Sequence, residues 1–503
     1  MGMENFNNML MGLATAAQPI NLLYCFIGSF IGTLIGVLPG IGPVGAIALL
    51  LPVTFHVPPL AAFIMFTGIM YGAQYGGSTT SILVNIPGEA SSVMTCLDGY
   101  QMARKGRAGP ALGMAAFASF IAGTLGLFGL AFLAPPLAEF GLRFGPPEYF
   151  ALMAFGLTLV IYLARGSLAK ALMMTAFGLV LASVGLDPVS SAPRFTYGII
   201  DLRDGVGLAQ MVIGLFGVSE VLLSVEKSFT RDIFETKIKG LLPNLQDWKD
   251  SFFPTLRASV ISFLMAIIPG ISVVIPTFIS YSLEKRISKH PERFGTGTIE
   301  GVAAPEAANN AAGVGSMIPL LSLGIPTGAS SALVLGALLI YGLHPGPLLI
   351  KESPEVFWGV IGSMYLGNAM LLLLNLPLIG IWVRLLKIPY AYLFSSIILF
   401  CLVGSYTINN SLTDMYIMIF FGIVGYLMNK FAYEPVPLIL ALVLGPMMEN
   451  AFRRSMILSD GSFLIFFTRP ISGILLALVL FMLISPLFTQ KRLGENIMKK
   501  TGD

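Results

Sequence analysis

Val37-Leu38-Pro39-Gly40-Ile41-Gly42 and, further along the chain, Ile86-Pro87-Gly88-Glu89-Ala90-Ser91-Ser92 interrupt an apolar sequence with proline and glycine. The same pair of interruptions recurs as Ile267-Ile268-Pro269-Gly270-Ile271-Ser272 and Ile325-Pro326-Thr327-Gly328-Ala329-Ser330-Ser331. Proline and glycine break helices, and broken backbone at membrane depth persists only where protein buries it or where it lines a watery cavity. Corresponding breaks in two parts of one chain therefore indicate the binding site of a transporter.

The composition predicts an all-α polytopic membrane protein. Of the 503 residues, 55% are hydrophobic and only 11% are charged, against about 25% charged in a soluble domain. Apolar runs such as residues 112–135 and 364–386 are long enough to cross a bilayer, which takes about 20 residues. We expect about 10–12 transmembrane segments together with re-entrant hairpins. Residues 18–37 are expected to be the first segment rather than a cleavable signal. The net charge of +3 gives no reason to expect a nucleic-acid partner.

The duplication divides the chain into two repeats. Pro39 and Pro269 are 230 positions apart, and Pro87 and Pro326 are 239 apart, so each repeat has about that length. The predicted organisation is a first repeat, a polar cytoplasmic linker, a second repeat and a polar cytoplasmic tail, at residues 1–225, 226–250, 251–490 and 491–503. The hairpin motifs lie near residues 37–43 and 71–92 in the first repeat, and near 267–276 and 304–331 in the second.

The loops predict that the two repeats have opposite orientations in the membrane. In the first repeat the loop between the motifs, residues 55–59, is uncharged, and the loop after the second motif, residues 104–107, is basic. The second repeat reverses this, since residues 285–293 are basic and residues 341–347 carry only a histidine. Because basic short loops mark the cytoplasmic side, equivalent loops lie on opposite sides, and the repeats are predicted to be inverted.

Small uncharged polar residues surround each break. A helix that begins after a Pro-Gly break presents backbone N–H groups that suit a carboxylate or phosphate. There is no lysine or arginine between Pro39 and Met102, so helix ends, amides and hydroxyls would hold an anion. The alternative interpretation is that small residues only allow close helix packing. The candidate substrate-binding residues are Gly40, Gly42, Tyr75, Gly76, Gly77, Ser78, Thr79, Asn85, Gly88, Thr327, Gly328 and Ser330.

Two carboxylates, Glu89 and Glu306, belong to the same neighbourhood. An acidic residue within the membrane is a functional candidate by default, and freed carbonyl, amide and hydroxyl oxygens suit a hard cation. We therefore predict that Glu306, Asn309, Asn310 and Glu89 bind a coupling Na⁺ or H⁺. The alternative is that either acid lies at the interface, or that Glu89 caps a helix. No cofactor is expected, and no metal site beyond one for Na⁺.

The motifs resemble the large membrane subunit of tripartite tricarboxylate transporters, the TctA family. The residues that carry the resemblance are Pro39-Gly40-Ile41-Gly42-Pro43, residues 71–78 with Asn85-Ile86-Pro87-Gly88, and Pro305-Glu306-Ala307-Ala308-Asn309-Asn310 with Gly324-Ile325-Pro326. The resemblance implies a permease of the bacterial cytoplasmic (inner) membrane. It also implies two partners, a small membrane subunit and a periplasmic substrate-binding protein, and uptake of a carboxylate driven by Na⁺ or H⁺.

The function predicted is secondary active uptake of a di- or tricarboxylate-like anion by alternating access. An uncoupled anion channel or exchanger on the same scaffold is the alternative. An intramembrane enzyme is not expected, because none of the three histidines lies near a nucleophile or metal-ligand pattern in the sequence.

Overall fold

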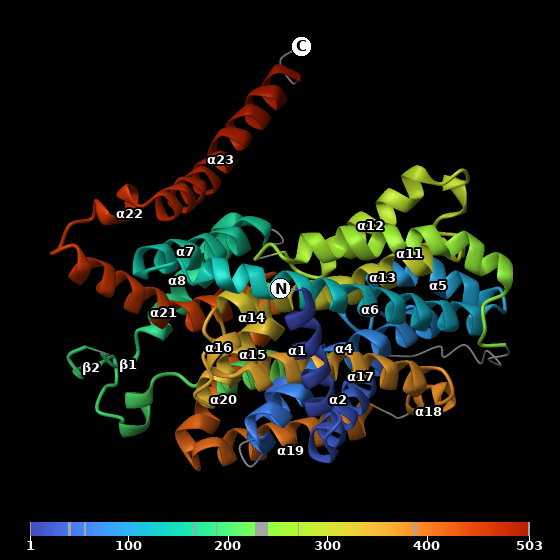
Figure 1. Ribbon diagram of the computed structural model, residues 1–503, viewed down its shortest axis with the longest axis horizontal. Helices are drawn as coiled ribbons and strands as arrows, with labels where there is room; N and C mark the ends of the chain where they lie inside the picture. The colour runs from blue at the N-terminus through green and yellow to red at the C-terminus, as the bar shows by residue number, and fades with distance from the viewer. Residues whose placement is uncertain are drawn as a thin grey trace. The chain divides into compact units, whose positions relative to one another are not determined.

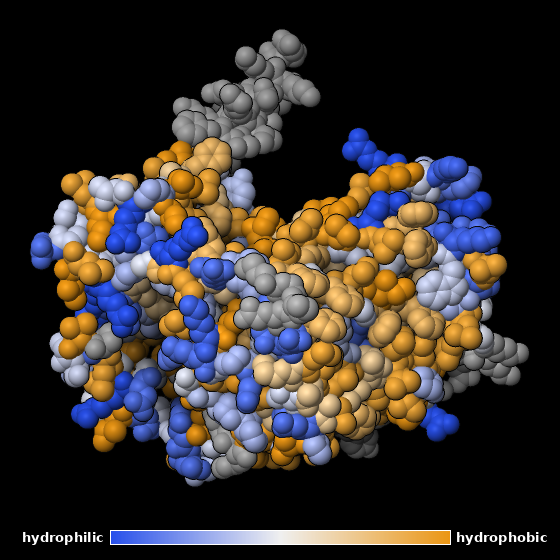
Figure 2. Space-filling view, viewed as in Figure 1, coloured by the Kyte–Doolittle hydropathy of each residue, from blue (hydrophilic) through white to orange (hydrophobic). Residues whose placement is uncertain are grey.

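The protein is almost entirely helical. The computed structural model describes residues 2–38, 42–54, 57–164, 167–187, 189–226, 240–269, 271–386 and 390–500, with side chains in helices omitted at 2–4, 390–394, 396 and 486–500. Seven helices in the described part are long and apolar enough to cross a membrane, and five shorter apolar helices accompany them. Large apolar side chains are exposed along many of these helices (Figure 2), as expected where helices face lipid. The chain is a multi-pass membrane protein.

The chain forms two compact units, and the larger comprises residues 1–141 and 207–427. Its helices, shown in Figure 1, are α1 (Gly2–Ala16), α2 (Pro19–Val37), α3 (Gly42–Thr54), α4 (Pro59–Val84), η1 (Ala90–Ser92), α5 (Val93–Arg104), α6 (Ala108–Gly141), α9 (Leu208–Val212), the π-helix η3 (Ile213–Val218), α10 (Ser219–Glu226), α11 (Leu245–Ala266), α12 (Val274–Ile287), η4 (Pro291–Arg293), α13 (Glu300–Gly315), α14 (Met317–Leu323), α15 (Ala329–Ile340), α16 (Leu349–Glu352), α17 (Pro354–Asn375), α18 (Ile379–Leu385), α19 (Tyr390–Asn409) and most of α20 (Leu412–Lys430).

All four predicted breaks separate helices. The first motif falls between α2 and α3, and its counterpart falls between α11 and α12. The second motif separates α4 from η1 and α5, and its counterpart separates α14 from α15. Pro39, Gly40, Ile41 and Gly270 themselves lie outside the described residues. The helix-breaking residues therefore interrupt the chain at corresponding places in both repeats.

The two second motifs adopt the same local structure. Asn85 follows α4 with a φ of 57°, and Gly324 follows α14 with a φ of 71°, so both helices end in a left-handed residue before Ile-Pro. Three residues after Glu89, the Ser92 hydroxyl accepts the Glu89 N–H and donates to the Glu89 carbonyl. Ser331 does the same for Gly328. A sequence duplication has thus become a duplicated turn and helix cap.

Glycines join α2 to α4 at very short range. A Cβ added to Gly76 would lie 2.2 Å from the Thr33 carbonyl oxygen, and one added to Gly36 would lie 2.3 Å from that of Ala73. Only glycine allows this approach of two helix backbones, as in close-packed membrane helix pairs. In the second repeat α11 packs against α13, and α13 also packs against α6. Figure 1 shows α13 beside these two helices.

The second compact unit comprises residues 142–206 and 428–503. It contains α7 (Pro146–Leu163), α8 (Leu168–Ala182), β1 (Gly185–Leu186), β2 (Pro193–Arg194), η2 (Ile200–Asp204), α21 (Val436–Leu458), α22 (Ile465–Thr468) and α23 (Pro470–Lys500). Helix α21 packs against α7 and α8, and β1 pairs antiparallel with β2.

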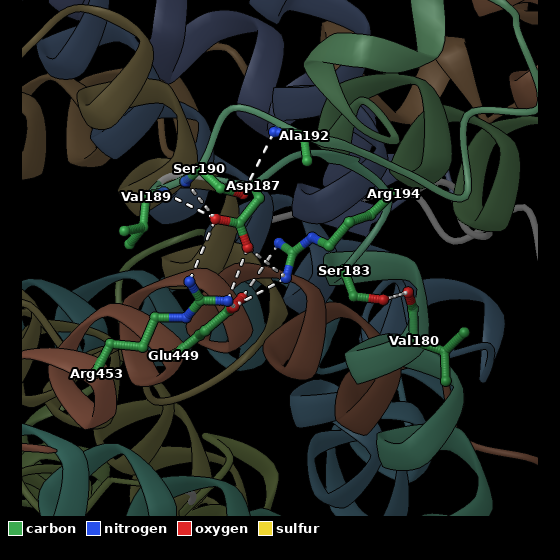
Figure 3. Close-up of polar contacts among 9 residues, drawn as sticks. All are labelled: Val180, Ser183, Asp187, Val189, Ser190, Ala192, Arg194, Glu449 and Arg453. Atoms are coloured by element: carbon green, nitrogen blue, oxygen red, sulfur yellow. Dashed lines mark hydrogen bonds and ion pairs between the residues drawn. The ribbon is translucent and has the colours of Figure 1, made fainter. Parts of the chain in front are cut away.

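An ion cluster attaches this two-stranded ribbon to α21 (Figure 3). Asp187 lies between Arg453, at 2.7 Å, and Arg194, at 3.5 Å, and Glu449 contacts both arginines. The backbone N–H groups of Ser190 and Val189 also donate to Asp187. These N–H groups and the Arg453 guanidinium hold the pKa of the Asp187 carboxyl well below its usual range. The ribbon is therefore fixed by charge pairing rather than by a long sheet.

The compact units do not coincide with the predicted repeats, because each unit takes segments from both repeats. Most of the predicted linker, residues 227–239, lies outside the described residues. α11 begins at Leu245, so the last residues assigned to the linker are already helical. The predicted tail from residue 491 continues α23 up to Lys500.

Candidate functional site

The candidate site is built around α13, which is buried along its length in the larger unit. Glu306 lies in the middle of this helix with no exposed surface. A charged group buried in this way is stable only when hydrogen bonds or ions compensate for the lost water. Three hydroxyl groups from the first repeat supply hydrogen bonds to it.

The hydroxyl donors come from three different helices. Ser78 on α4 donates to Oε2 of Glu306 at 2.5 Å, and Ser119 on α6 donates to the same oxygen at 3.4 Å. Thr95 on α5 donates to Oε1. The predicted site residues Ser78 and Glu306 are therefore in direct contact, although 228 positions separate them in the sequence.

Glu89 makes a second contact between the repeats. Asn309 donates from Nδ2 to Oε1 of Glu89 at 2.9 Å, and Ser91 donates to the same oxygen. Asn309 lies three residues after Glu306 on α13, close to one turn of about 3.6 residues, so both carboxylates lie beside the same stretch of helix. Three of the predicted coupling-ion residues thus lie on α13, and the fourth, Glu89, lies just before η1 and contacts α13 through Asn309.

Several oxygen atoms of this region have no hydrogen-bond partner. Within the described residues, Oδ1 of Asn309, Oδ1 of Asn310 and Oε1 of Gln74 are buried without a donor. Gln74 is adjacent, since its Nε2 lies 3.5 Å from the Asn309 carbonyl oxygen. Unpaired buried acceptors are unfavourable by about 1–3 kcal/mol each. Amide oxygens and carboxylates are the types of ligand that suit a hard cation.

The other predicted residues of the first repeat have different surroundings. The Tyr75 hydroxyl donates to Oδ1 of Asn368 on α17 at 2.8 Å, and Thr79 is buried beside it on α4. A Cβ added to Gly77 would lie 3.0 Å from Cγ of Glu89, so this glycine lets the motif approach α4. A Cβ added to Gly76 or to Gly88 would lie 2.2 Å from a carbonyl oxygen of α2, so close packing against α2 accounts for both glycines.

The second-repeat motif makes its hydrogen bonds locally. The N–H groups of Thr327 and Gly328, the two residues before α15, both donate to the Ser331 hydroxyl, so the turn satisfies them locally. Ser330 is half-buried. Gly42 begins α3 with a φ of 63° in open space. Asn85 forms the end of α4 described above, and Gly40 lies outside the described residues.

Sequence reasoning missed Thr95, Ser119 and Asp98. Asp98 is fully buried on α5, where it accepts hydrogen bonds from the Tyr281 hydroxyl and from the N–H groups of Gly295, Gly297 and Thr298. Thr95 precedes it by three residues and therefore lies on the same face of α5. This clamp fixes the helix that aims Thr95 at Glu306. The available signal was an aspartate in the helix that follows directly on a break.

The clamp also brings two loops together. Lys105, in the basic loop after α5, donates to the Thr296 carbonyl at 2.6 Å, and Arg107 pairs with Asp247 at 2.6 Å. Arg293 lines the same pocket as Lys105 and Arg107, so the predicted cytoplasmic loops 104–107 and 285–293 border the same part of the larger unit. Figure 2 shows hydrophilic residues gathered where the loop after α12 lies.

Comparison with known proteins identifies the family. Residues 22–440 match the family described as "Tripartite tricarboxylate transporter TctA family". The chain belongs to the TctA family. It is 47% identical over 475 residues to an Agrobacterium vitis protein described as "Uncharacterized 52.8 kDa protein in TAR-I ttuC' 3'region", covering 94% of this chain and 95% of that protein. It is 50% identical over 215 residues to "Uncharacterized protein in TAR-II ttuC' 3'region" of the same organism, and the match covers 43% of this chain and 89% of that protein. No solved structure matches the chain.

As a TctA protein, the chain is a component of a tripartite tricarboxylate transporter. This membership implies a substrate-binding protein and a small membrane subunit as partners. The buried α13 site then lies within a membrane transport protein, where acids on buried helices commonly belong to ion pathways.

Proposed function

We propose that this TctA protein is the permease for secondary active uptake of a di- or tricarboxylate-like anion in the cytoplasmic (inner) membrane. A periplasmic binding protein delivers the anion, and movement of Na⁺ or H⁺ down its gradient drives uptake. The observation that carries this proposal is the buried site on α13. Glu306 and Asn309 lie three residues apart on this helix, Asn309 contacts Glu89 and Gln74, and the amide oxygens of Asn309 and Gln74 are buried without a donor in the described part of the chain. Carboxylate and amide oxygens of this kind are ligands for a monovalent cation.

The coupling cation binds Glu306, Asn309, Asn310 and Glu89 in this proposal. Both carboxylates contact residues of the opposite repeat, Glu306 through Ser78 and Glu89 through Asn309. A cation bound here would change the attraction between the repeats, which is the requirement for linking ion binding to a conformational change.

The anion binds at the breaks beside this site. Helix starts and hydroxyl groups bind carboxylates without a basic side chain, and Ser78 and Thr79 lie next to the cation site on α4. A cation close to the anion would also offset the anion's charge. This arrangement accounts for coupling, because each ion makes the site more favourable for the other.

Alternating access uses the two repeats as inverted halves. The contact between Lys105 and Thr296 supports this proposal, because it puts the loop after the second motif of one repeat beside the loop between the motifs of the other. Equivalent loops would then lie on opposite sides of the membrane.

The test is uptake of labelled di- and tricarboxylates into proteoliposomes that contain the chain, its small subunit and its binding protein. An imposed inward Na⁺ or H⁺ gradient should drive accumulation above the external concentration. Vesicles without the binding protein and vesicles with dissipated gradients are the controls. If the anion only equilibrates under every gradient, the chain is a channel or exchanger and the proposed coupling is wrong.

A further inference from the structure

A small cavity in the larger unit lies beside the candidate site and has no role in the site described so far. Its volume is about 10 Å³, which is close to the space that one water molecule needs. Helices α4, α6 and α17 and the first residue of α18 enclose it. The lining residues are Tyr75, Ser78, Thr79, Leu112, Ala115, Ala116, Ser119, Asn375 and Ile379.

One layer of hydroxyl groups separates this cavity from the buried carboxylate. Ser78 and Ser119 both line the cavity, and both donate to Oε2 of Glu306. A cation or water molecule in the cavity would therefore contact the same two serine residues that donate to Glu306. The cavity and Glu306 therefore share the side chains of Ser78 and Ser119.

Asn375, which lines the cavity, has a side-chain oxygen to which no described residue donates a hydrogen bond. Its side chain is 5% exposed, and its Nδ2 donates to the Leu371 carbonyl at 2.9 Å. Its Oδ1 is buried and has no donor among the described residues. A buried carbonyl oxygen without a donor is unfavourable, and a cation or its hydration water in the cavity would remove that penalty. No motif or break in the sequence singles out this residue.

The cavity lies toward the end of the unit that the charge pattern marks as cytoplasmic. Its α6 residues belong to the first turns after the basic loop 104–107. Asn375 is the last residue of α17, and Arg384 and Lys387 follow it in the sequence. Basic residues after a membrane helix indicate the cytoplasmic side.

We propose that this cavity is the inner part of the cation route. A monovalent cation that has bound at Glu306 leaves toward the cytoplasm past Ser78 and Ser119, and Oδ1 of Asn375 binds it in passage. This inference rests on the proposed ion coupling. Carbonyl and hydroxyl oxygens serve either Na⁺ or a hydrated proton, so separate Na⁺ and pH gradients distinguish the two cations.

The test compares net uptake with exchange in proteoliposomes containing the complete transporter. Net uptake requires the cation to leave on the inner side, whereas exchange of labelled for unlabelled carboxylate can proceed with the cation still bound. Asn375→Leu keeps the side-chain size and removes the carbonyl. It should reduce gradient-driven net uptake about tenfold, as expected for a higher barrier to cation release, and leave exchange within about twofold of wild type.

Asn368→Leu, seven residues earlier on α17, is the matched control. All polar atoms of the Asn368 amide are used, because Tyr75 donates to it and it donates to Phe120 and Thr124. Because Asn368→Leu removes these structural hydrogen bonds, it should lower net uptake and exchange by the same factor. Ser119→Ala is a second, milder variant; it removes one hydroxyl group of the cavity wall and should lower gradient-driven net uptake.

The proposal is overturned if Asn375→Leu leaves both modes unchanged or lowers both equally. If that variant does not fold, unchanged net uptake by Ser119→Ala overturns it instead. If instead the proposed ion-coupled uptake is wrong, the result differs, because vesicles with the wild-type protein would then show no cation-driven uptake at all.

Discussion

Asn310 combines a weak hydrogen bond with an unused oxygen. Its Nδ2 lies 3.3 Å from the Glu306 carbonyl, and its Oδ1 is buried without a donor. If that oxygen binds the coupling cation, Asn310→Ala should raise the cation concentration for half-maximal uptake about tenfold, as expected for loss of one ligand. Initial uptake rates measured against Na⁺ and against pH will show the shift. An unchanged cation dependence with normal expression would make Asn310 a packing residue.

At the scale of single residues, the sequence predicted the acids, the amides and the donor Ser78, but not the donors Thr95 and Ser119. Glu306 and Asn309 stand out because charged and amide side chains are rare in buried membrane helices. Thr95 and Ser119 do not stand out, because hydroxyl groups are common there and usually bond within their own helix. Thr95 reaches Glu306 across 211 positions of sequence, and only the packing of α5 and α6 on α13 reveals that contact.

At the scale of helices, the approach of α4 to α2 depends on Gly76. An alanine Cβ there would lie 2.2 Å from the Thr33 carbonyl oxygen, far inside contact distance. Gly76→Ala should destabilise the protein by about 1–3 kcal/mol, seen as a lower unfolding temperature in detergent. A Cβ added to Gly380 on α18 would have no atom within 4 Å. Gly380→Ala should therefore leave the unfolding temperature unchanged. A stable Gly76→Ala protein with weakened substrate affinity would instead support direct substrate contact.

The ribbon of the second unit should depend on pH through Asp187. Because hydrogen bonds lower the folded pKa of this carboxyl, its contribution to stability is complete above the ordinary aspartate pKa of about 3.9 and is lost as pH falls below it. The unfolding-temperature difference between wild type and Asp187→Asn should therefore be constant from neutral pH to about pH 5 and shrink below about pH 4. The exposed Asp204→Asn is the control. A difference that stays constant into acid would contradict this account.

The helix breaks were predictable because proline and glycine act locally. The ends of α2, α4 and α14 follow directly from Pro-Gly-type residues and the left-handed Asn85 and Gly324. The grouping of helices was not predictable in the same way. The clamp of Asp98 and the ion cluster at Asp187 each join segments about 200 or more positions apart, and periodicity carries no information about such pairs.

At the scale of the whole molecule, the inverted arrangement predicts where loops lie. Loops 104–107 and 285–293 should both be cytoplasmic, as the positive charge and the contact of Lys105 with Thr296 indicate. Phosphatase and fluorescent-protein reporters fused after Arg107 and after Arg293 should both report the cytoplasm, and a fusion within residues 341–347 should report the periplasm. Opposite reports at Arg107 and Arg293 would rule out the inverted repeats.

The measurement that tests the central claim most directly is gradient-driven uptake by Glu306→Gln. Glutamine keeps the size of the side chain and removes the negative charge that Ser78, Thr95 and Ser119 contact. The variant should insert and assemble normally but lose the acceleration of carboxylate uptake by an imposed Na⁺ or H⁺ gradient, while passive substrate exchange persists. Retention of the full wild-type response to the gradient would show that ion coupling does not run through Glu306.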